Sequence, residues 1–246
     1  MPSNPASGAL YMLQGIGMLT RPGLKRYVLI PLAVNVVVFG GGIWLGAAAF
    51  EALMDRMQAS LPAWLGWLEW LLWPVFLLAA LVVVFYCFTL VANFLAAPFN
   101  GLLADKVERV LTGRPVTADG DWEQLLRELP GTLADEARKI GYAMLWGVPL
   151  LVLAFVLPVI GPLLWFLFSA WSLALEYADF PMGNHGLKFR DMRAALARRR
   201  LLSLGFGATA TALTAIPVVN FLVMPGGVAG ATLLWVRELR EAADTV

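Results

Sequence analysis

The sequence predicts an all-α integral membrane protein with two long transmembrane helices, two proline-broken helical hairpins that penetrate half of the bilayer, and a cytoplasmic amphipathic helical segment. The first reason is composition. Of the 246 residues 60% are apolar and 14% charged, and the mean hydropathy is +0.74, far from the balance of a soluble domain. The second is that long apolar blocks alternate with charged stretches. The third is that nearly all lysines and arginines fall in connections that this topology places on one side of the membrane.

We expect a single membrane domain. Its predicted parts are an N-terminal interfacial helix and basic turn (1–26), a first transmembrane helix (27–50), a periplasmic connection (51–69), a second transmembrane helix (70–99), cytoplasmic helices (100–139), a first hairpin (140–175), a basic loop (176–200), a second hairpin (201–236) and a tail (237–246). No removable signal peptide is expected, because the start has no basic stretch before a short apolar one. Cys87 is the only cysteine and lies in an apolar run, which excludes a disulfide framework.

The first half of the chain holds two apolar blocks long enough to span a bilayer. Residues 9–19 are apolar but too short to cross, so they suit a helix that lies at the interface or packs on the bundle. The block 27–50 has about the 20 residues that a crossing needs. The block 70–99 follows a crowd of tryptophans typical of an interfacial belt. We expect its helix to end at Pro98-Phe99-Asn100-Gly101, a cluster of helix breakers.

The region 100–139 alternates apolar and charged residues at helical spacing, which predicts amphipathic helices with solvated charged faces. A turn is expected at Gly113-Arg114-Pro115, and Asp121 is a candidate N-cap for the helix that follows it.

The last two apolar blocks, 140–175 and 201–236, are each broken near the middle. As one straight helix each block would be about 54 Å long, against a hydrocarbon core of about 30 Å. Prolines and glycines interrupt the first block at 158–162 and the second at 217–220 and again at 225–227. The halves are slightly short for full spans, so we interpret each block as a hairpin that enters the membrane and returns.

The positions of the cations test this interpretation. Residues 100–139 and 176–200 carry six lysines or arginines each, whereas 51–69 carries one, Arg56. Two crossings followed by two hairpins place every cation except Arg56 on the cytoplasmic side, together with both termini. A single crossing by each long block would put 176–200 outside, against the positive-inside rule.

A basic turn at Thr20–Pro31 connects the first helix to the first crossing. Pro22 and Gly23 form the turn, and Lys25 and Arg26 follow at the start of a helix, where unpaired N–H groups and the helix dipole favour anions. No acidic residue precedes Glu51. These residues are compatible with a cationic membrane anchor, the more common reading, and with an anion site.

Other chemistry-bearing residues are few. The sequence has no phosphate-binding loop with Lys-Ser/Thr, no nucleophile elbow and no two-histidine metal motif, and we predict no catalytic residue, metal or cofactor. His185 is the only histidine and is interpreted as structural. Glu176 and Asp179 are expected to pair with Arg190 or Arg193, with proton coupling as the alternative. The remaining candidates for a polar path or for coupling are Asn35, Asn93, Asn100 and Glu108.

Four stretches of this chain resemble one known family. They are RPGLKRYVLIPL (21–32), APFNGLLA (97–104), LWFLFSAW (164–171), and Ile216-Pro217 through Met224-Pro225 with Gly230-Ala231-Thr232. They resemble the CysZ-type sulfate permeases of bacterial inner membranes, over nearly the whole chain. The resemblance implies two crossing helices, two half-penetrating hairpins, a homo-oligomer, and sulfate import that feeds cysteine synthesis. It also implies an anion site at a Gly-Leu/Ile-Arg-Arg turn, which falls here on Gly23, Leu24, Lys25 and Arg26.

We therefore predict a multi-pass inner-membrane sulfate transporter for sulfate assimilation and cysteine biosynthesis, whose partners are the sulfate ion, the lipid bilayer and further copies of itself, with no nucleic acid. Lys25 departs from the family pattern: a lysine keeps the charge but lacks the planar fork with which arginine grips two oxygens. The alternative is a membrane scaffold or regulator whose basic turn binds anionic lipid headgroups. A membrane-embedded enzyme is a more distant one.

Overall fold

Helices account for almost all of the chain in the computed structural model. It describes residues 4–60, 67–113 and 122–240, with the backbone alone at 35, 57–60, 68–69, 83–98 and 122–133. The helices are α1 (Pro5–Met18), α2 (Arg26–Ser60), α3 (Trp67–Thr112), α4 (Trp122–Val156), α5 (Ile160–Asn184), α6 (Phe189–Arg198), α7 (Arg200–Thr214), α8 (Pro217–Leu234) and the π-helical turn η2 (Trp235–Leu239). No strand occurs within these ranges, which confirms the all-α class.

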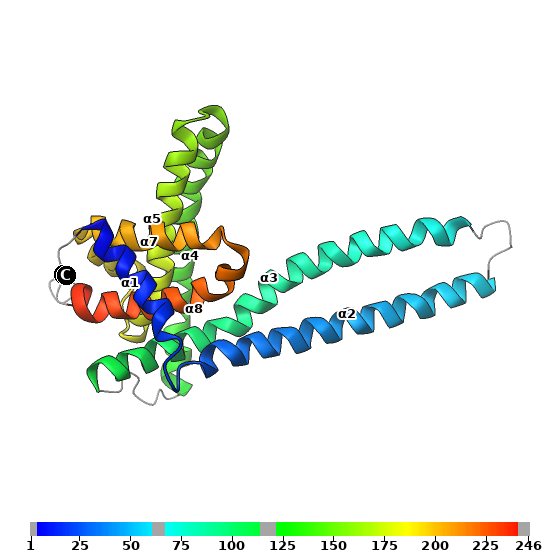
Figure 1. The fold of residues 1–246 in the computed structure, drawn as a ribbon, viewed down its shortest axis with the longest axis horizontal. Coiled ribbons are helices and arrows are strands. Elements are labelled where there is room, and N and C mark those ends of the chain that lie inside the picture. Colours follow the sequence, from blue (N-terminus) through cyan, green and yellow to red (C-terminus); the bar gives the residue numbers. More distant parts are fainter. Residues whose placement is uncertain (1–3, 61–66, 114–121, 241–246) are drawn as a thin grey trace. The chain divides into compact units, whose positions relative to one another are not determined.

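The chain divides into two units (Figure 1). One unit is formed by Leu29–Phe99, which is most of α2 and the first part of α3. The other joins Met1–Val28 to Asn100–Val246 and holds the remaining helices together with the end of α3. The second unit also contains the basic turn and the other polar residues that the sequence singles out and whose side chains are described.

The unit 29–99 is a pair of long apolar helices. Phe50 of α2 stacks on Phe76 of α3 with ring centroids 3.8 Å apart. The rings of Phe50 and Trp73 form a T-shaped contact with centroids 4.6 Å apart. Most other described side chains of the pair are exposed, including the large apolar Trp44 and Trp70 at 70% and 87%. Apolar surface of this extent requires hydrocarbon rather than water around it.

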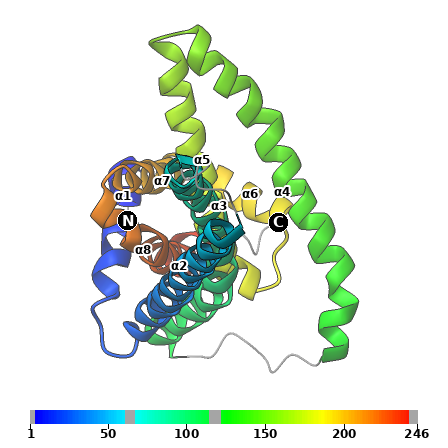
Figure 2. The same ribbon diagram turned by 90° about the vertical axis from the view of Figure 1, so that its right-hand side faces the viewer.

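The core of the other unit forms where α1 lies across α7 and α8 (Figure 2). Backbones approach closely there: a Cβ on Gly15 of α1 would overlap the Gly226 carbonyl oxygen and the Gly230 nitrogen of α8. Gly226 and Gly230 are spaced as in the small-xxx-small pattern of membrane helix pairs. The helix break predicted at 225–227 is wrong, because α8 runs through these residues without interruption. Gly226 and Gly230 instead allow the backbone of α1 to pack closely against α8.

Tyr11 ties α1 to the end of the chain. Its side chain is 1% exposed and its hydroxyl donates a hydrogen bond of 2.8 Å to Oε1 of Glu238 in η2. Burial, with the added effect of the neighbouring carboxylate, raises the pKa of Tyr11 to about 12.

We expect Tyr11→Phe to lower the melting temperature in detergent at pH 8 by about 4–8 °C, because a hydrogen bond to a charged group contributes about 1.5–3 kcal/mol. The folded pKa lies above the ordinary value of about 10, so the hydroxyl stabilises the fold below pH 10 and loses this effect as the pH rises towards 12. The wild type should lose stability between pH 9 and 11.5 more steeply than the variant. Parallel pH profiles would contradict this account.

A helix break does occur near the middle of each of the last apolar blocks, but it lies slightly earlier than the predicted stretches 158–162 and 217–220, whose later residues are helical. Helices α4 and α5 meet at a tip formed by residues 157–159, and α7 and α8 are separated at 215–216, with Pro217 in the first turn of α8 (Figure 2). A proline at this position loses no helical hydrogen bond, because the first N–H groups of a helix have no partner within it.

Two other expectations about helix ends are wrong. Helix α3 does not stop at 98–101 but continues to Thr112, since a membrane helix tolerates a proline when neighbouring groups compensate for the lost hydrogen bond. The stretch 176–200 is mostly helical rather than a loop: α5 runs to Asn184 and α6 follows, with buried Phe189, Met192 and Leu196 on one face. Helix α3 ends next to the turn predicted at 113–115, and Gly113 has φ of +73°, while Arg114, Pro115 and Asp121 lie outside the described residues.

Four helical segments of the described chain are long and apolar enough to cross a membrane. They are Arg26–Arg56, Ala134–Val156, Ile160–Asn184 and Pro217–Leu239. The last segment differs from the others because 61% of an apolar 18-residue stretch within it is buried inside the protein. Helix α7 has 15 residues and a length of about 22 Å, less than the hydrocarbon thickness of about 30 Å.

Candidate anion-binding site

The basic turn lies between α1 and α2 and is held by its own backbone. The N–H of Leu24 donates to the Arg21 carbonyl at 3.2 Å, and Gly23 between them has φ of +87°, which a side chain would strain. Leu24 is 1% exposed and belongs to the hydrophobic core. The buried leucine thus fixes the turn on the protein, while Gly23, Lys25 and Arg26 around it are exposed.

The turn combines positive charge with unused hydrogen-bond donors. Among the described residues, no carboxylate pairs with Arg21, Lys25 or Arg26, and no acceptor meets the backbone N–H groups of Gly23, Lys25 and Arg26. The Arg26 guanidinium lies 5.0 Å from the Tyr27 ring centroid and donates to its hydroxyl at 3.1 Å, which restrains it beside the helix start. An anion here would meet three cations and free N–H groups at the positive end of α2.

A second polar cluster surrounds Glu108, near the end of α3. Glu108 is 2% exposed, and its two carboxylate oxygens each lie 3.0 Å from Nε2 of His185. Arg240 approaches the same carboxylate at 3.8 Å. The His185 ring packs on Trp235 with centroids 5.4 Å apart. This arrangement gives His185 a specific buried partner, in agreement with its interpretation as a structural residue.

Asn100 and Asn184 lie at the other end of the same α3 segment. The Asn184 amide donates to the Gly101 carbonyl at 3.0 Å, whereas the buried Nδ2 of Asn100 has no hydrogen-bond partner among the described residues. The sequence singles out Asn100 and Glu108 but does not predict that His185 and Arg240 lie at Glu108, or that Asn184 binds Gly101 next to Asn100. The residues of these pairs lie 77 or more positions apart, and no local pattern connects them.

The acids Glu176 and Asp179 do not pair with the predicted arginines. Asp179 Oδ2 accepts from Lys139 Nζ at 2.7 Å, and Lys139 also reaches Glu136 at 3.1 Å. Glu176 lines a cavity of about 280 Å³ together with Lys139 and Asp179. The prediction of an ion pair is right for Asp179 but its partner is wrong, because α4 and α5 form a hairpin that places Lys139 opposite Asp179.

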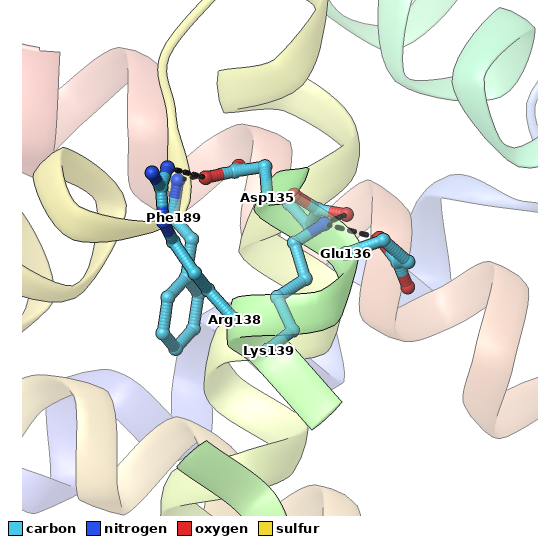
Figure 3. A network of polar contacts seen from close by, with 6 residues as sticks. Asp135, Glu136, Arg138, Lys139 and Phe189 are labelled. Atoms are coloured by element: carbon cyan, nitrogen blue, oxygen red, sulfur yellow. Dashed lines mark hydrogen bonds and ion pairs between the residues drawn. The ribbon is translucent and has the colours of Figure 1, made fainter. Parts of the chain in front are cut away.

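One further acid in this region caps a helix. Asp135, which is 6% exposed, accepts a hydrogen bond of 2.8 Å from the backbone N–H of Phe189, and Arg138 lies 3.6 Å from its other oxygen (Figure 3). A carboxylate at the first N–H groups of α6 stabilises that helix end. Asp135 therefore has a structural role, and it fixes the orientation of α6 against α4.

The structure separates the predicted residues into three groups. Gly23, Leu24, Lys25 and Arg26 form one turn, Asn100 and Glu108 lie along one segment of α3, and Glu176 and Asp179 share a cavity with Lys139. The side chains of Asn35 and Asn93 lie outside the described residues. In the described part of the chain, no group of three or more His, Cys, Asp and Glu side chains is arranged to hold a metal ion.

The fold defines a helical membrane protein, and its basic turn is exposed and has no carboxylate partner among the described residues. Comparison with known proteins gives its family. The family model described as "Sulfate transporter CysZ/Etoposide-induced protein 2.4" matches residues 11–225, so the chain belongs to this family.

Relatives named "Sulfate transporter CysZ" extend the match to nearly the full length. The protein from Pseudomonas syringae pv. tomato is 43% identical over 240 residues, which cover 97% of this chain and 95% of the relative. The one from Pseudomonas fluorescens is also 43% identical, over 97% and 96%. The one from Vibrio atlanticus is 41% identical over 245 residues, 98% and 96% of the two chains.

Proposed function

We propose that this protein transports sulfate across the bacterial inner membrane, and that sulfate binds at the turn Gly23–Arg26. The observation that carries the site is the group of exposed cations and free backbone N–H groups at the start of α2, which has no carboxylate partner among the described residues. The relatives' name supports the substrate. Uptake would supply sulfate assimilation and cysteine biosynthesis.

The chemistry of the turn suits sulfate better than phosphate. Sulfate at neutral pH is a dianion without a proton, so it needs only donors and positive charge, and charge-assisted N–H donors supply both. Phosphate usually keeps a proton, and a site built for it gains from a carboxylate that accepts this proton. No acidic residue precedes Glu51, and none pairs with the turn within the described residues.

The route beyond the turn includes Asn100 and Glu108 in this proposal. Both are buried, and the unpaired Nδ2 of Asn100 offers a donor to a passing anion. Movement of a dianion into a cell with a negative interior costs about 2.3 kcal/mol per charge per 100 mV, so import needs coupling, a steep gradient or consumption of sulfate inside. Glu108, Glu176 and Asp179 are the candidate groups for proton coupling.

The membrane arrangement that we propose has α2 and α3 crossing and the two hairpins entering and leaving on the cytoplasmic side. The length of α7, too short to span, supports a half-penetrating second hairpin. The turn at 157–159 returns α5 to the side from which α4 starts, so the six cations of 176–200 join the six of 100–139. Both termini are then cytoplasmic, and several copies assemble, as the family resemblance implies.

Cysteine labelling in intact cells tests this topology. On a Cys87→Ala background, Gly183→Cys, exposed near the end of α5, should resist a membrane-impermeant maleimide until the cells are opened. The matched position Asp55→Cys, exposed near the end of α2, should react from outside. Labelling of Gly183→Cys in intact cells at the rate of Asp55→Cys would contradict the proposed arrangement.

Uptake of radiolabelled sulfate by proteoliposomes tests the function itself. Vesicles containing the purified full-length protein should accumulate sulfate faster than protein-free vesicles, with saturation as the sulfate concentration rises. A scaffold whose turn only binds anionic lipid would insert normally and give uptake equal to that of empty vesicles, which would contradict the proposal.

A further inference from the structure

A groove of about 750 Å³ lies between α4, α5, α6 and α7, apart from the basic turn and from the Glu108 cluster. Each of the first three helices contributes one stripe at helical spacing. Helix α4 presents Tyr142, Trp146 and Leu150, and α5 presents positions 164, 167, 168 and 171. Helix α6 presents positions 190, 193, 194 and 197. Spacings of three and four residues place each set on one helix face, so the groove is a continuous surface.

One end of this groove is apolar. Towards the tip of the α4–α5 hairpin its walls are Leu150, Leu164, Leu167 and Phe168, with Trp146 beside them. These residues belong to two candidate membrane spans, 134–156 and 160–184. From Tyr142 to Leu150 the α4 wall is about 12 Å long. Within a bilayer, we expect lipid acyl chains to fill this apolar end of the groove.

The other end is cationic. Arg190 and Arg193 of α6 and Arg200 of α7 line it, all three exposed. Within the described part of the chain, none of them is ion-paired to a carboxylate. The Arg200 Nε donates to the Ala197 carbonyl at 3.1 Å, which orients its guanidinium. Three unpaired arginines beside one groove indicate an anionic ligand group.

Aromatic residues join the two ends. The Arg193 guanidinium lies 5.3 Å from the Tyr142 ring centroid, and the Trp171 indole donates to the Tyr142 hydroxyl at 3.0 Å. Tyrosine and tryptophan favour such a boundary between hydrocarbon and polar headgroups.

We propose that this groove binds one anionic phospholipid, with its phosphate at Arg190, Arg193 and Arg200 and an acyl chain along the apolar end. A free oxyanion would bind the arginines but leave the apolar end of the groove unfilled. A zwitterionic lipid would fill the apolar end of the groove but would leave the positive charge of the arginines uncompensated. Only an anionic lipid matches both halves of the groove, and the site is distinct from the turn at Gly23–Arg26.

Native mass spectrometry of the full-length protein in detergent tests this site. The probes are phosphatidylglycerol and phosphatidylcholine with the same palmitoyl and oleoyl chains. We expect at least about tenfold stronger retention of phosphatidylglycerol, since three arginines line the groove and each cation near an anionic headgroup strengthens binding by about fivefold. Arg190→Gln with Arg193→Gln should remove this preference. Lys188→Gln with Arg198→Gln, which removes the same charge from exposed positions outside the groove, should keep it.

A second pair of variants distinguishes a lipid from a free anion. Leu164→Trp fills the apolar end and should lower retention of both lipids several-fold, whereas Leu163→Trp, exposed next to it and outside the groove, should not. Equal retention of the two lipids by the wild type would overturn the proposal. So would normal lipid retention by Leu164→Trp together with displacement by inorganic phosphate, which would indicate a free-anion site. A change in oligomeric mass by Leu164→Trp without loss of lipid would assign the groove to a second copy of the chain.

Discussion

Proteoliposomes carrying the variant Lys25→Ala with Arg26→Ala should take up sulfate at least about tenfold more slowly than those carrying the wild type. Two charge-assisted contacts contribute about 1.5–3 kcal/mol each, and a loss of about 1.4 kcal/mol already lowers binding tenfold. Both side chains are exposed, and neither forms an ion pair among the described residues, so folding and insertion should stay normal. The variant therefore separates anion binding from structure.

The matched control is Lys188→Ala with Arg198→Ala, which removes one lysine and one arginine from exposed positions at α6. If uptake depends only on total positive charge near the membrane, the two double variants will be equally slow. If it depends on the turn, the control will keep the wild-type rate. Lys25→Arg introduces the arginine that the family resemblance implies at this position and should lower the sulfate concentration needed for half-maximal uptake, because the guanidinium binds two oxygens at once.

The second large effect is expected at Gly15, where α1 crosses α8. A Cβ there would overlap backbone atoms of Gly226 and Gly230, which cannot move aside as a flexible side chain can. Gly15→Ala should therefore destabilise the protein by about 3 kcal/mol or more and lower the melting temperature in detergent by about 6–12 °C. Differential scanning fluorimetry measures this directly.

Gly17→Ala is the control within the same helix. Apart from the backbone of α1 itself and the neighbouring residues, no atom lies within 4 Å of a Cβ built at Gly17, and alanine is the better helix former by about 1 kcal/mol. Its melting temperature should equal or exceed that of the wild type. Equal losses at the two positions would mean that the close crossing of α1 and α8 does not determine stability.

The sequence predicts those helix ends that depend on local chemistry. The breaks near Pro158 and before Pro217 coincide with prolines, whose ring and missing N–H disfavour continuation of a helix. Gly226 and Gly227 also resemble helix breakers in the sequence but serve close packing instead: Gly226 lies against Ile16 of α1, more than two hundred residues away, and Gly227 lies against Tyr177 of α5. Hydropathy also cannot show that α3 passes through 98–101, since the groups that compensate a membrane proline belong to other parts of the chain.

In the candidate site, too, some features can be predicted from local sequence and others depend on residues far away in the chain. The turn at Gly23–Arg26 is contiguous, so its cations, its glycine and the helix start can all be read from the sequence. The partners of Asp179 and Glu108 cannot, because Lys139 is 40 positions away and His185 is 77 positions away. Charge counting suggests that the acids are paired, but only the hairpin geometry determines the cation with which each one pairs.

Equilibrium binding of radiolabelled sulfate to the purified protein measures directly whether sulfate binds at the turn Gly23–Arg26. We expect one saturable class of sites in the wild type and in Lys188→Ala with Arg198→Ala, and at least about tenfold weaker binding in Lys25→Ala with Arg26→Ala. Saturable binding of unchanged affinity in the Lys25 and Arg26 variant would contradict the assignment of the sulfate site to the turn.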